Sequence, residues 1–174
     1  HVAGNQKITT HQFEDRDIIA YAEEGNDAVV QVFFVRNGKL IGREHFYLTT
    51  VPGDTGKDIL TSFIKQYYIG TPFIPRELLV QEEVEEPELL SQLLSRNQNY
   101  TVRIVNPKKG SKEKLVELAA KNAGNLLEQN KEKYRREQKR TVGAVEEIEE
   151  LIGIMGIHRM EAYDISNTNG YESV

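Results

Sequence analysis

The feature that most constrains the fold is a run of seven residues, 29–35, in which every position except Gln31 is apolar. A strand that is covered on both faces has this composition. The run ends at Arg36-Asn-Gly-Lys39, and Asn-Gly is the two-residue turn whose positive φ angles match the twist of paired strands. We therefore expect a long β-hairpin whose second strand covers about residues 39–48. A shorter apolar run at residues 17–22, followed by a polar turn, predicts a strand before it.

Helices and strands alternate in the next part of the chain. Apolar residues at helical spacing predict a helix from about residue 57, which ends before the prolines at positions 72 and 75. Pro87 opens a second helix, at a position where its missing N–H costs nothing. Short apolar segments at residues 77–81 and 100–105 predict two more strands.

A long helix follows, for which we expect Ser111 to be the N-terminal cap. Its apolar stripe of leucine and alanine ends at Leu127, whereas charged residues continue to Arg140. About 30 helical residues at ~1.5 Å each span roughly 45 Å, so we expect the last third to extend past the domain. A helix at residues 142–152 is expected to continue it, and residues 159–166 predict a new strand.

This order of elements predicts an α/β fold with a mixed five-stranded sheet and flanking helices, of the ribonuclease H-like type. Three antiparallel strands come first, and two strands linked by helices follow. We expect residues 1–14 to be a linker and residues 15–140 to be one ribonuclease H-like domain. Residues 141–174 would then hold a connecting helix and the first strand of a second, truncated domain of the same fold.

Composition excludes several classes of function. The 174 residues include no cysteine, which rules out disulfides and thiol catalysis, and the four histidines show no metal-ligand spacing. No apolar run approaches the ~18 residues of a membrane span, and no signal peptide is evident. We therefore expect a cytoplasmic protein with no membrane partner.

The charge is unevenly distributed along the chain. The whole chain has a net charge of −5, but residues 108–140 hold eleven basic and five acidic residues, a net charge of +6. Such a segment in an acidic chain favours contact with a polyanion, although a solvated helix face has the same pattern. The candidate nucleic-acid-binding residues are Lys108, Lys109, Lys131, Lys133, Arg135, Arg136, Lys139 and Arg140.

Nucleases of the ribonuclease H-like type hold two divalent metal ions with acids on the first strand, the first helix and the end of the fourth strand. Here Asp15 and Asp17 stand at the entry of the first strand, and residues 18–22 contain no acid. Asp58 lies in the first turn of the first helix, where an acid complements the helix dipole. The fourth strand runs into Gln81-Glu-Glu83, which could supply a ligand or start an acidic loop. We therefore expect a catalytically degenerate domain.

Asp164 is a separate candidate ligand. It lies inside an otherwise apolar strand and is followed at once by a polar turn. An unpaired buried carboxylate is costly, so such a residue usually pairs with a metal ion, a cation or several backbone N–H groups. A cap of the strand end through Ser166 or Asn167 is the alternative.

Several strings in this chain occur together and in this order in one protein family. The most specific are Phe63-Ile-Lys-Gln-Tyr-Tyr68 and Glu161-Ala-Tyr-Asp-Ile-Ser-Asn167, and others are Ile74-Pro-Arg-Glu77 and Asn106-Pro-Lys-Lys-Gly110. On these strings the chain, from about Gln6 onward, resembles the UvrC family, the nuclease subunits of the bacterial UvrABC excinuclease.

The resemblance implies a multidomain nuclease of nucleotide excision repair and the SOS response. In this family a GIY-YIG nuclease makes the 3′ incision, a helical segment binds UvrB, and a C-terminal ribonuclease H-like nuclease makes the 5′ incision ahead of helix-hairpin-helix units. The present chain corresponds to the region after the UvrB-binding segment. Asp164 corresponds to the first carboxylate of the C-terminal nuclease, a ligand of its catalytic Mg²⁺ or Mn²⁺, and its partner residues would lie beyond Val174.

The resemblance also implies that the intact protein hydrolyses phosphodiester bonds, with UvrB and damaged DNA as partners and with no small-molecule substrate. For this chain alone we expect a non-catalytic module that positions DNA or protein and needs no cofactor of its own. Two alternatives are a pure protein-interaction module and an endonuclease V-like nuclease. The second would need an Asp inside the first strand, where residues 18–22 have none.

Overall fold

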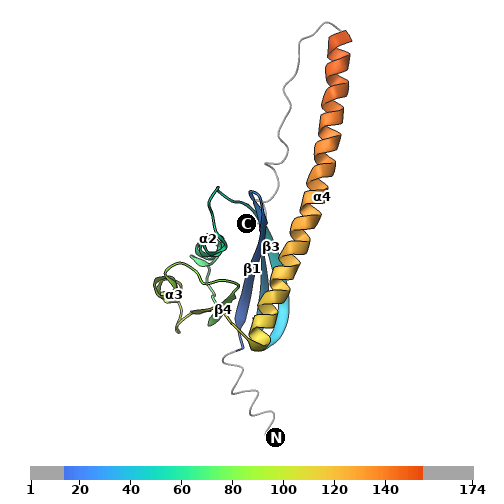
Figure 1. Ribbon diagram of the computed structural model, residues 1–174. Coiled ribbons are helices and arrows are strands. Elements are labelled where there is room, and N and C mark those ends of the chain that lie inside the picture. The colour runs from blue at the N-terminus through green and yellow to red at the C-terminus, as the bar shows by residue number, and fades with distance from the viewer. Residues whose placement is uncertain (1–13, 155–174) are drawn as a thin grey trace.

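The computed structural model describes residues 14–154, which form a five-stranded mixed sheet flanked by helices (Figure 1). The strands are β1 (Arg16–Glu24), β2 (Asp27–Arg36), β3 (Lys39–Thr49), β4 (Glu77–Val80) and β5 (Arg103–Val105). Their order across the sheet is β3-β2-β1-β4-β5. The first three pair antiparallel, and β4 and β5 run parallel to β1. The predicted ribonuclease H-like arrangement is confirmed; the strand expected at residues 159–166 lies outside the described residues.

The hairpin between β2 and β3 turns at Asn37 and Gly38, as the Asn-Gly pair predicts. Their φ angles are 53° and 74°, the positive values that a two-residue turn of this kind requires. The Asn37 N–H donates to Oδ1 of Asp15 at 2.9 Å, and the Gly38 N–H donates to the carbonyl of Glu14 at 3.2 Å. The segment that leads into β1 therefore holds both turn residues.

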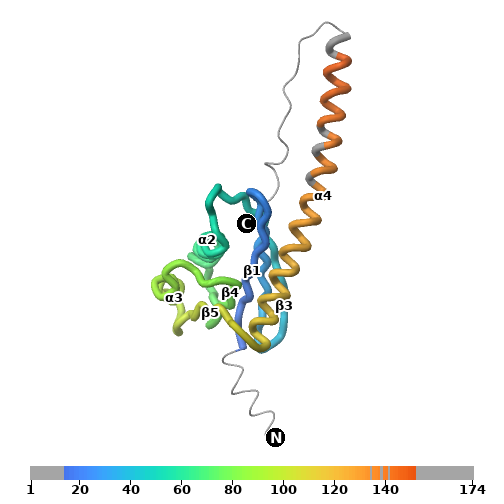
Figure 2. Tube along the Cα trace, in the orientation of Figure 1, coloured from blue at the N-terminus to red at the C-terminus, as the bar shows by residue number. Residues whose placement is uncertain are grey.

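Helices cover both faces of the sheet (Figures 1 and 2). Helices α2 (Gly56–Tyr68) and α3 (Pro87–Ser95) lie on one face, and α4 (Gly110–Ile154) crosses the other. Alternate residues of a strand face opposite sides, so Ile19 of β1 packs in the core with α2 whereas Ile18 packs in the core with α4. Because both faces are buried, β2 is apolar almost throughout.

Strand β5 is shorter than the predicted segment 100–105 because the backbone of Val102 is bound to α3 instead of β4. The Ser91 hydroxyl donates to the carbonyl of Val102, and the Val102 N–H donates to Oγ of Ser95 at 2.7 Å. Pairing with β4 therefore begins at Arg103.

Helix α4 is one unbroken helix of 45 residues, about 68 Å long at ~1.5 Å per residue. It joins the long helix and the helix at residues 142–152 that the sequence predicts, and it passes residue 140 without interruption. The prediction that Ser111 caps this helix is wrong. The helix begins at Gly110, whose φ of 83° turns the chain out of the preceding loop, a conformation that glycine adopts without strain.

The first half of α4 packs on the sheet and the second half does not. Ala123 and Leu127 are its last residues in the buried core, and the Lys131 ammonium group then pairs with Glu24 at the end of β1. Residues 132–154 continue past the sheet (Figure 1). Although α4 is long enough for a membrane span, neither it nor another helix within residues 14–154 has the apolar stretch that one requires.

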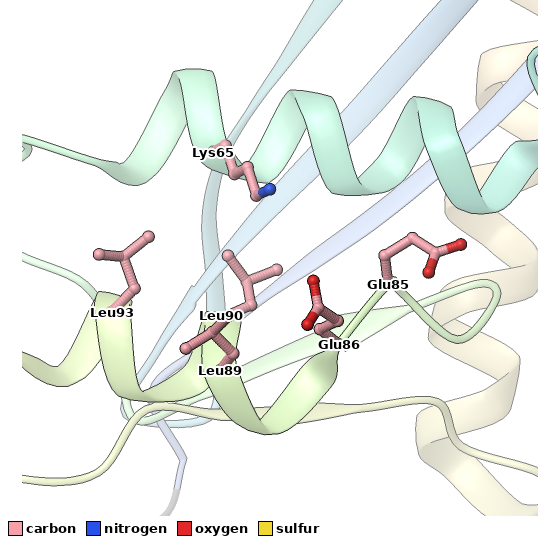
Figure 3. Close-up of a pocket in the computed structure, with 6 residues that line it drawn as sticks. All are labelled: Lys65, Glu85, Glu86, Leu89, Leu90 and Leu93. Atoms are coloured by element: carbon pink, nitrogen blue, oxygen red, sulfur yellow. The ribbon is translucent and has the colours of Figure 1, made fainter.

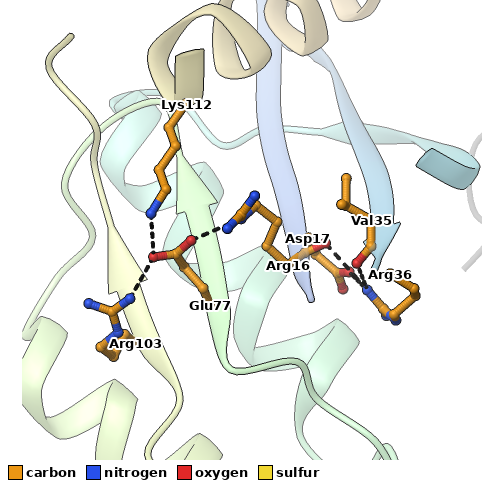
Figure 4. A network of polar contacts seen from close by, with 7 residues as sticks. All are labelled: Arg16, Asp17, Val35, Arg36, Glu77, Arg103 and Lys112. Carbon is orange, nitrogen blue, oxygen red and sulfur yellow. Dashed lines mark hydrogen bonds and ion pairs between the residues drawn. The ribbon is translucent and has the colours of Figure 1, made fainter. Parts of the chain in front are cut away.

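A buried carboxylate joins four elements of the fold (Figure 4). Glu77, the first residue of β4, is 2% exposed. Its Oε1 accepts a hydrogen bond from Arg16 of β1 at 3.0 Å, and its Oε2 accepts from Arg103 of β5 at 2.8 Å and from Lys112 of α4 at 3.0 Å. An unpaired carboxylate at this depth would be costly, so the three cations hold β1, β5 and the start of α4 around β4.

We expect Glu77→Ala to lower the free energy of unfolding by about 3 kcal/mol, because it leaves three clustered cations without their counter-charge. The effect stays at the low end of the usual range, since the side chains of Arg103 and Lys112 are 58% and 40% exposed. Arg103→Ala should cost less than about 1 kcal/mol, because a pair with an exposed cation contributes little. Urea unfolding at neutral pH measures both variants, and equal losses would contradict the central role of Glu77.

Candidate functional site

At one edge of the sheet the carboxyl end of β4 lies beside the middle of β1, because the two strands are parallel neighbours whose pairing ends at Ile19 and Val80. Nucleases of this fold type hold metal-binding acids on these two strands. Here the Tyr21 hydroxyl donates to Oε2 of Glu82, and the Tyr21 N–H donates to Oε1 of Gln81 at 2.8 Å. This edge of the sheet therefore brings together one carboxylate, one phenol and one carboxamide.

The start of α2 closes the same edge. Gly56 is buried, and a Cβ atom at this position would overlap the Tyr21 hydroxyl and the Glu82 carboxylate. Burial and the neighbouring Glu82 raise the pKa of Tyr21, so the phenol remains a protonated donor at neutral pH. Two divalent cations require several oxygen ligands with free lone pairs. A single carboxylate that already accepts from a phenol does not fit such a centre.

The other acids that the sequence offered as ligands lie apart from this edge. Asp15 accepts from the turn at Asn37, beside the amino end of β1. Asp58 accepts from the N–H and the hydroxyl of Thr55, and these bonds lower the pKa of Asp58 while they cap α2. Glu83 is exposed. Within residues 14–154 no group of three or more Asp, Glu or His side chains could hold a metal ion.

Asp17, the second residue of β1, is buried with 1% exposure. Tyr68 of α2 donates to its Oδ2 at 2.6 Å, and Arg36 of β2 donates to its Oδ1 at 2.8 Å (Figure 4 shows the Arg36 contact). Burial raises the pKa of Asp17, and the hydrogen bonds from Tyr68 and Arg36 oppose that rise. Tyr21 lies four positions after Asp17, about 13 Å along the strand. Asp17 is therefore a carboxylate that joins β1, β2 and α2, distant from Glu82.

A small notch of about 80 Å³ lies between α2 and α3 (Figure 3). That volume holds two or three water molecules at ~30 Å³ each, or one side chain. Its lining residues are Lys65, Glu85, Glu86, Leu89, Leu90 and Leu93. The notch can accommodate a packed side chain, because half of its lining residues are leucines. Its one amine and two carboxylates do not make a set of catalytic groups.

Some of the predicted basic residues form ion pairs in the described part of the chain, and others are exposed. Lys131 pairs with Glu24 and thereby holds α4 to the sheet, and Arg135 pairs with Glu132 at 3.5 Å within the helix. Lys108 and Lys109 are exposed just before α4 begins. The others are exposed on the part of α4 beyond the sheet, and in the described part of the chain they form no ion pair: Lys133, Arg136, Lys139 and Arg140.

The sequence gives no signal that Tyr21 and Gly56 close this edge of the sheet. Tyr21 has the pattern of an ordinary strand residue, and its contact with Glu82 spans 61 positions. Gly56 has the pattern of a loop glycine before a helix. Both roles depend on the pairing of β1 with β4. Asp164, the remaining predicted site residue, lies outside the described residues.

Comparison with known proteins agrees with the fold. The family described as UvrC Ribonuclease H-like domain matches residues 15–130, and the match ends where α4 leaves the sheet. UvrABC system protein C of Lachnospira eligens is 56% identical over 173 residues, which is 99% of this chain. The proteins of that name from Alkaliphilus metalliredigens and Acetivibrio thermocellus are 44% and 39% identical over 97% and 100% of this chain. The chain spans 27–28% of the length of these three relatives.

We expect the stability of the wild type relative to Asp17→Asn to fall as the pH rises. The folded-state pKa of Asp17 lies above its ordinary value of 3.8, so folding favours the protonated carboxyl group. The stability that this protonation adds to the wild type is fully present below pH 3.8, and it is lost as the pH rises through the folded-state pKa of Asp17.

The carboxamide of the variant does not titrate, so the difference between the two proteins isolates this one group. Urea unfolding of both, in a pH series that begins below 3.8, measures that difference. A wild-type advantage that grows with pH would mean that the Arg36 ion pair outweighs the desolvation of Asp17.

Proposed function

The chain belongs to the UvrC family, and from this premise we propose that residues 14–154 are a non-catalytic ribonuclease H-like module of an excinuclease subunit in nucleotide excision repair. The intact protein would incise damaged DNA on both sides of a lesion together with UvrB, in the cytoplasm and with Mg²⁺ or Mn²⁺. The relatives are named UvrABC system protein C, and this name supports the proposed role of the intact protein. Since the chain spans 28% of the first relative, the other nuclease and partner-binding parts would belong to the rest of the protein.

The observation that carries the non-catalytic role is the closed edge of the sheet. Glu82 accepts from the Tyr21 hydroxyl, and Gly56 packs against both. Phosphodiester hydrolysis by two metal ions needs acids that grip both cations. The chemistry of incision would therefore come from other parts of the protein, and this module would supply rigidity and position.

Helix α4 supports the positioning role. At ~1.5 Å per residue, residues 132–154 extend about 35 Å past the sheet, and the helix is continuous across residue 140. In the proposed division, residues 15–140 form the ribonuclease H-like domain and residues 141–174 lead into the C-terminal nuclease. Asp164 would be the first metal ligand of that nuclease. A rigid helix between them would set the distance of the nuclease from the module.

An incision assay on the intact protein tests this division of labour. Asp164→Asn should reduce the 5′ incision to background, because it removes the charge of a metal ligand, and should leave the 3′ incision intact. Glu82→Gln should leave both incision rates unchanged, since a carboxamide oxygen still accepts from Tyr21. End-labelled duplex with a single lesion, incubated with UvrB and Mg²⁺, reports the two cuts separately.

Loss of either cut in Glu82→Gln, in a variant that unfolds like the wild type, would place catalysis at the sheet edge and overturn the non-catalytic role. The isolated 174-residue chain should not cut the same duplex. If that chain did cut the duplex, the non-catalytic role would also be overturned.

We further propose that the basic segment at residues 108–140 contacts nucleic acid. The candidates are the basic residues before and along α4: Lys108, Lys109, Lys131, Lys133, Arg135, Arg136, Lys139 and Arg140. Lys133, Arg136, Lys139 and Arg140 have the strongest support, because they are exposed and their charges are not neutralised by another described residue. A pure protein-interaction module remains the second candidate, since an acidic protein surface would also meet these cations.

The salt dependence of DNA binding separates the two candidates. The double variant Lys133→Glu, Arg136→Glu should weaken binding to duplex DNA at low salt by about tenfold or more. It should also reduce the slope of log K against log salt by ~0.9 for each phosphate that the variant no longer neutralises. Lys131 stays unchanged in this design because it pairs with Glu24. Unaltered DNA affinity and slope, measured by fluorescence anisotropy, would favour the protein-interaction alternative.

A further inference from the structure

A polar groove of about 330 Å³ lies between the edge strand β3 and helix α4. The helix packs mainly on β1, β2 and β4, and Tyr47 is the β3 residue that packs partly with it among the described core clusters. Three of the lining residues come from the sheet and four from the helix: Gln31, Arg43, His45, Asn122, Asn125, Leu126 and Gln129. The groove is separate from the edge that holds Tyr21 and Glu82.

The floor of the groove is fixed in place. Gln31 is 2% exposed, and its Nε2 donates to the carbonyl of Glu44 at 2.9 Å and to that of Val32 at 3.2 Å. Its neighbour across the sheet is His45, whose ring contacts that of Tyr47 with 5.3 Å between centroids. A carboxamide held in this way in an otherwise apolar strand makes the floor polar without leaving it free to move.

The lining is rich in donors and has no carboxylate. Arg43 is exposed and forms no ion pair with another residue in the range 14–154. Its guanidinium group can present two parallel N–H donors to a phosphate. Carboxamides of Asn and Gln also donate to phosphate oxygens in complexes with nucleic acids, and Asn125 and Gln129 are exposed at the rim. This donor set can bind the oxygens of a phosphate group.

The helix side of the groove continues into the unpaired cations of α4. Residues three and four positions apart share a face of a helix, so the face that carries Asn125 and Gln129 continues through Lys133, Arg136 and Arg140. By the same spacing, Glu132 and Glu137 lie beside this line, four positions from Arg136 and Lys133 respectively. The groove therefore opens onto a cationic stripe that has acids at its borders.

We propose that the groove and this stripe form one track for the phosphate backbone of a nucleic acid strand, with Arg43 as the contact on the sheet. The inference rests on the proposed nucleic-acid role of α4 and extends it to β3. Binding along such a track would orient the strand parallel to α4, from the sheet as far as Arg140, because beyond Arg140 the helix has no basic residue and carries four glutamates between positions 146 and 150. Contacts to phosphate carry no sequence information, so such a track would not select for sequence.

Charge reversal at Arg43 tests the track. Arg43→Glu should weaken binding of a fluorescein-labelled DNA duplex by about fivefold or more and reduce the slope of log K against log salt by ~0.9. The matched control is Lys65→Glu, which makes the same change of charge at an exposed residue of α2, on the opposite face of the sheet. The control should change the affinity by less than about twofold, since it removes no phosphate contact.

A second variant separates a loss of DNA binding from a loss of folding. Asn125→Asp places a carboxylate on the exposed rim of the groove and should also weaken binding. Thermal unfolding of each variant shows whether the fold is kept.

The outcomes distinguish this inference from the proposed function. If Arg43→Glu and Asn125→Asp bind DNA like the wild type while the Lys133, Arg136 double variant does not, the groove is excluded and the helix contact stands. If Lys65→Glu loses as much affinity as Arg43→Glu, net charge alone explains the effect and the track is wrong. If a polyglutamate peptide binds at the groove as tightly as DNA and no longer binds to Arg43→Glu, the partner is an acidic protein and the inference fails.

Discussion

The structure depends on the charge cluster at the amino end of β4. This strand has four residues and β5 has three, so few ladder hydrogen bonds secure the parallel half of the sheet. Glu77 compensates because its two oxygens bind cations from β1, β5 and α4 at once. The contact with Lys112 fixes the start of α4 against β4. A rigid helix that is fixed at its start and packed as far as Leu127 has its direction set for the remaining residues as well.

The two ends of β1 have different roles, and neither resembles a metal centre. Near the amino end Asp17 is held by Arg36 and Tyr68, and in the second half of the strand Tyr21 is held by Glu82. Each carboxylate stabilises contacts between elements. The sheet has the ribonuclease H-like topology, and within residues 14–154 no group of three or more Asp, Glu or His side chains could hold a metal ion.

Helix α4 divides into two halves that differ in what their charges do. Along the sheet, Lys112 and Lys131 are paired with acids of the strands. Beyond the sheet, Lys133, Arg136, Lys139 and Arg140 face solvent. The family match ends at residue 130, close to this division. A segment with one continuous basic composition thus contains cations that stabilise the fold and cations that are available to a partner.

The sequence by itself determined the order of the elements, the hairpin at Asn37-Gly38, the topology and the family, because periodicity, turn residues and short strings are local signals. It also located the basic segment and the lack of acids in residues 18–22. The tertiary structure alone decided which cations stay unpaired, since Lys112 and Lys131 meet acids 35 and 107 positions away. It likewise decided that Tyr21 closes the sheet edge and that Arg43 and Asn125 line one groove. Such contacts arise where the sheet brings distant segments together, and no local pattern records them.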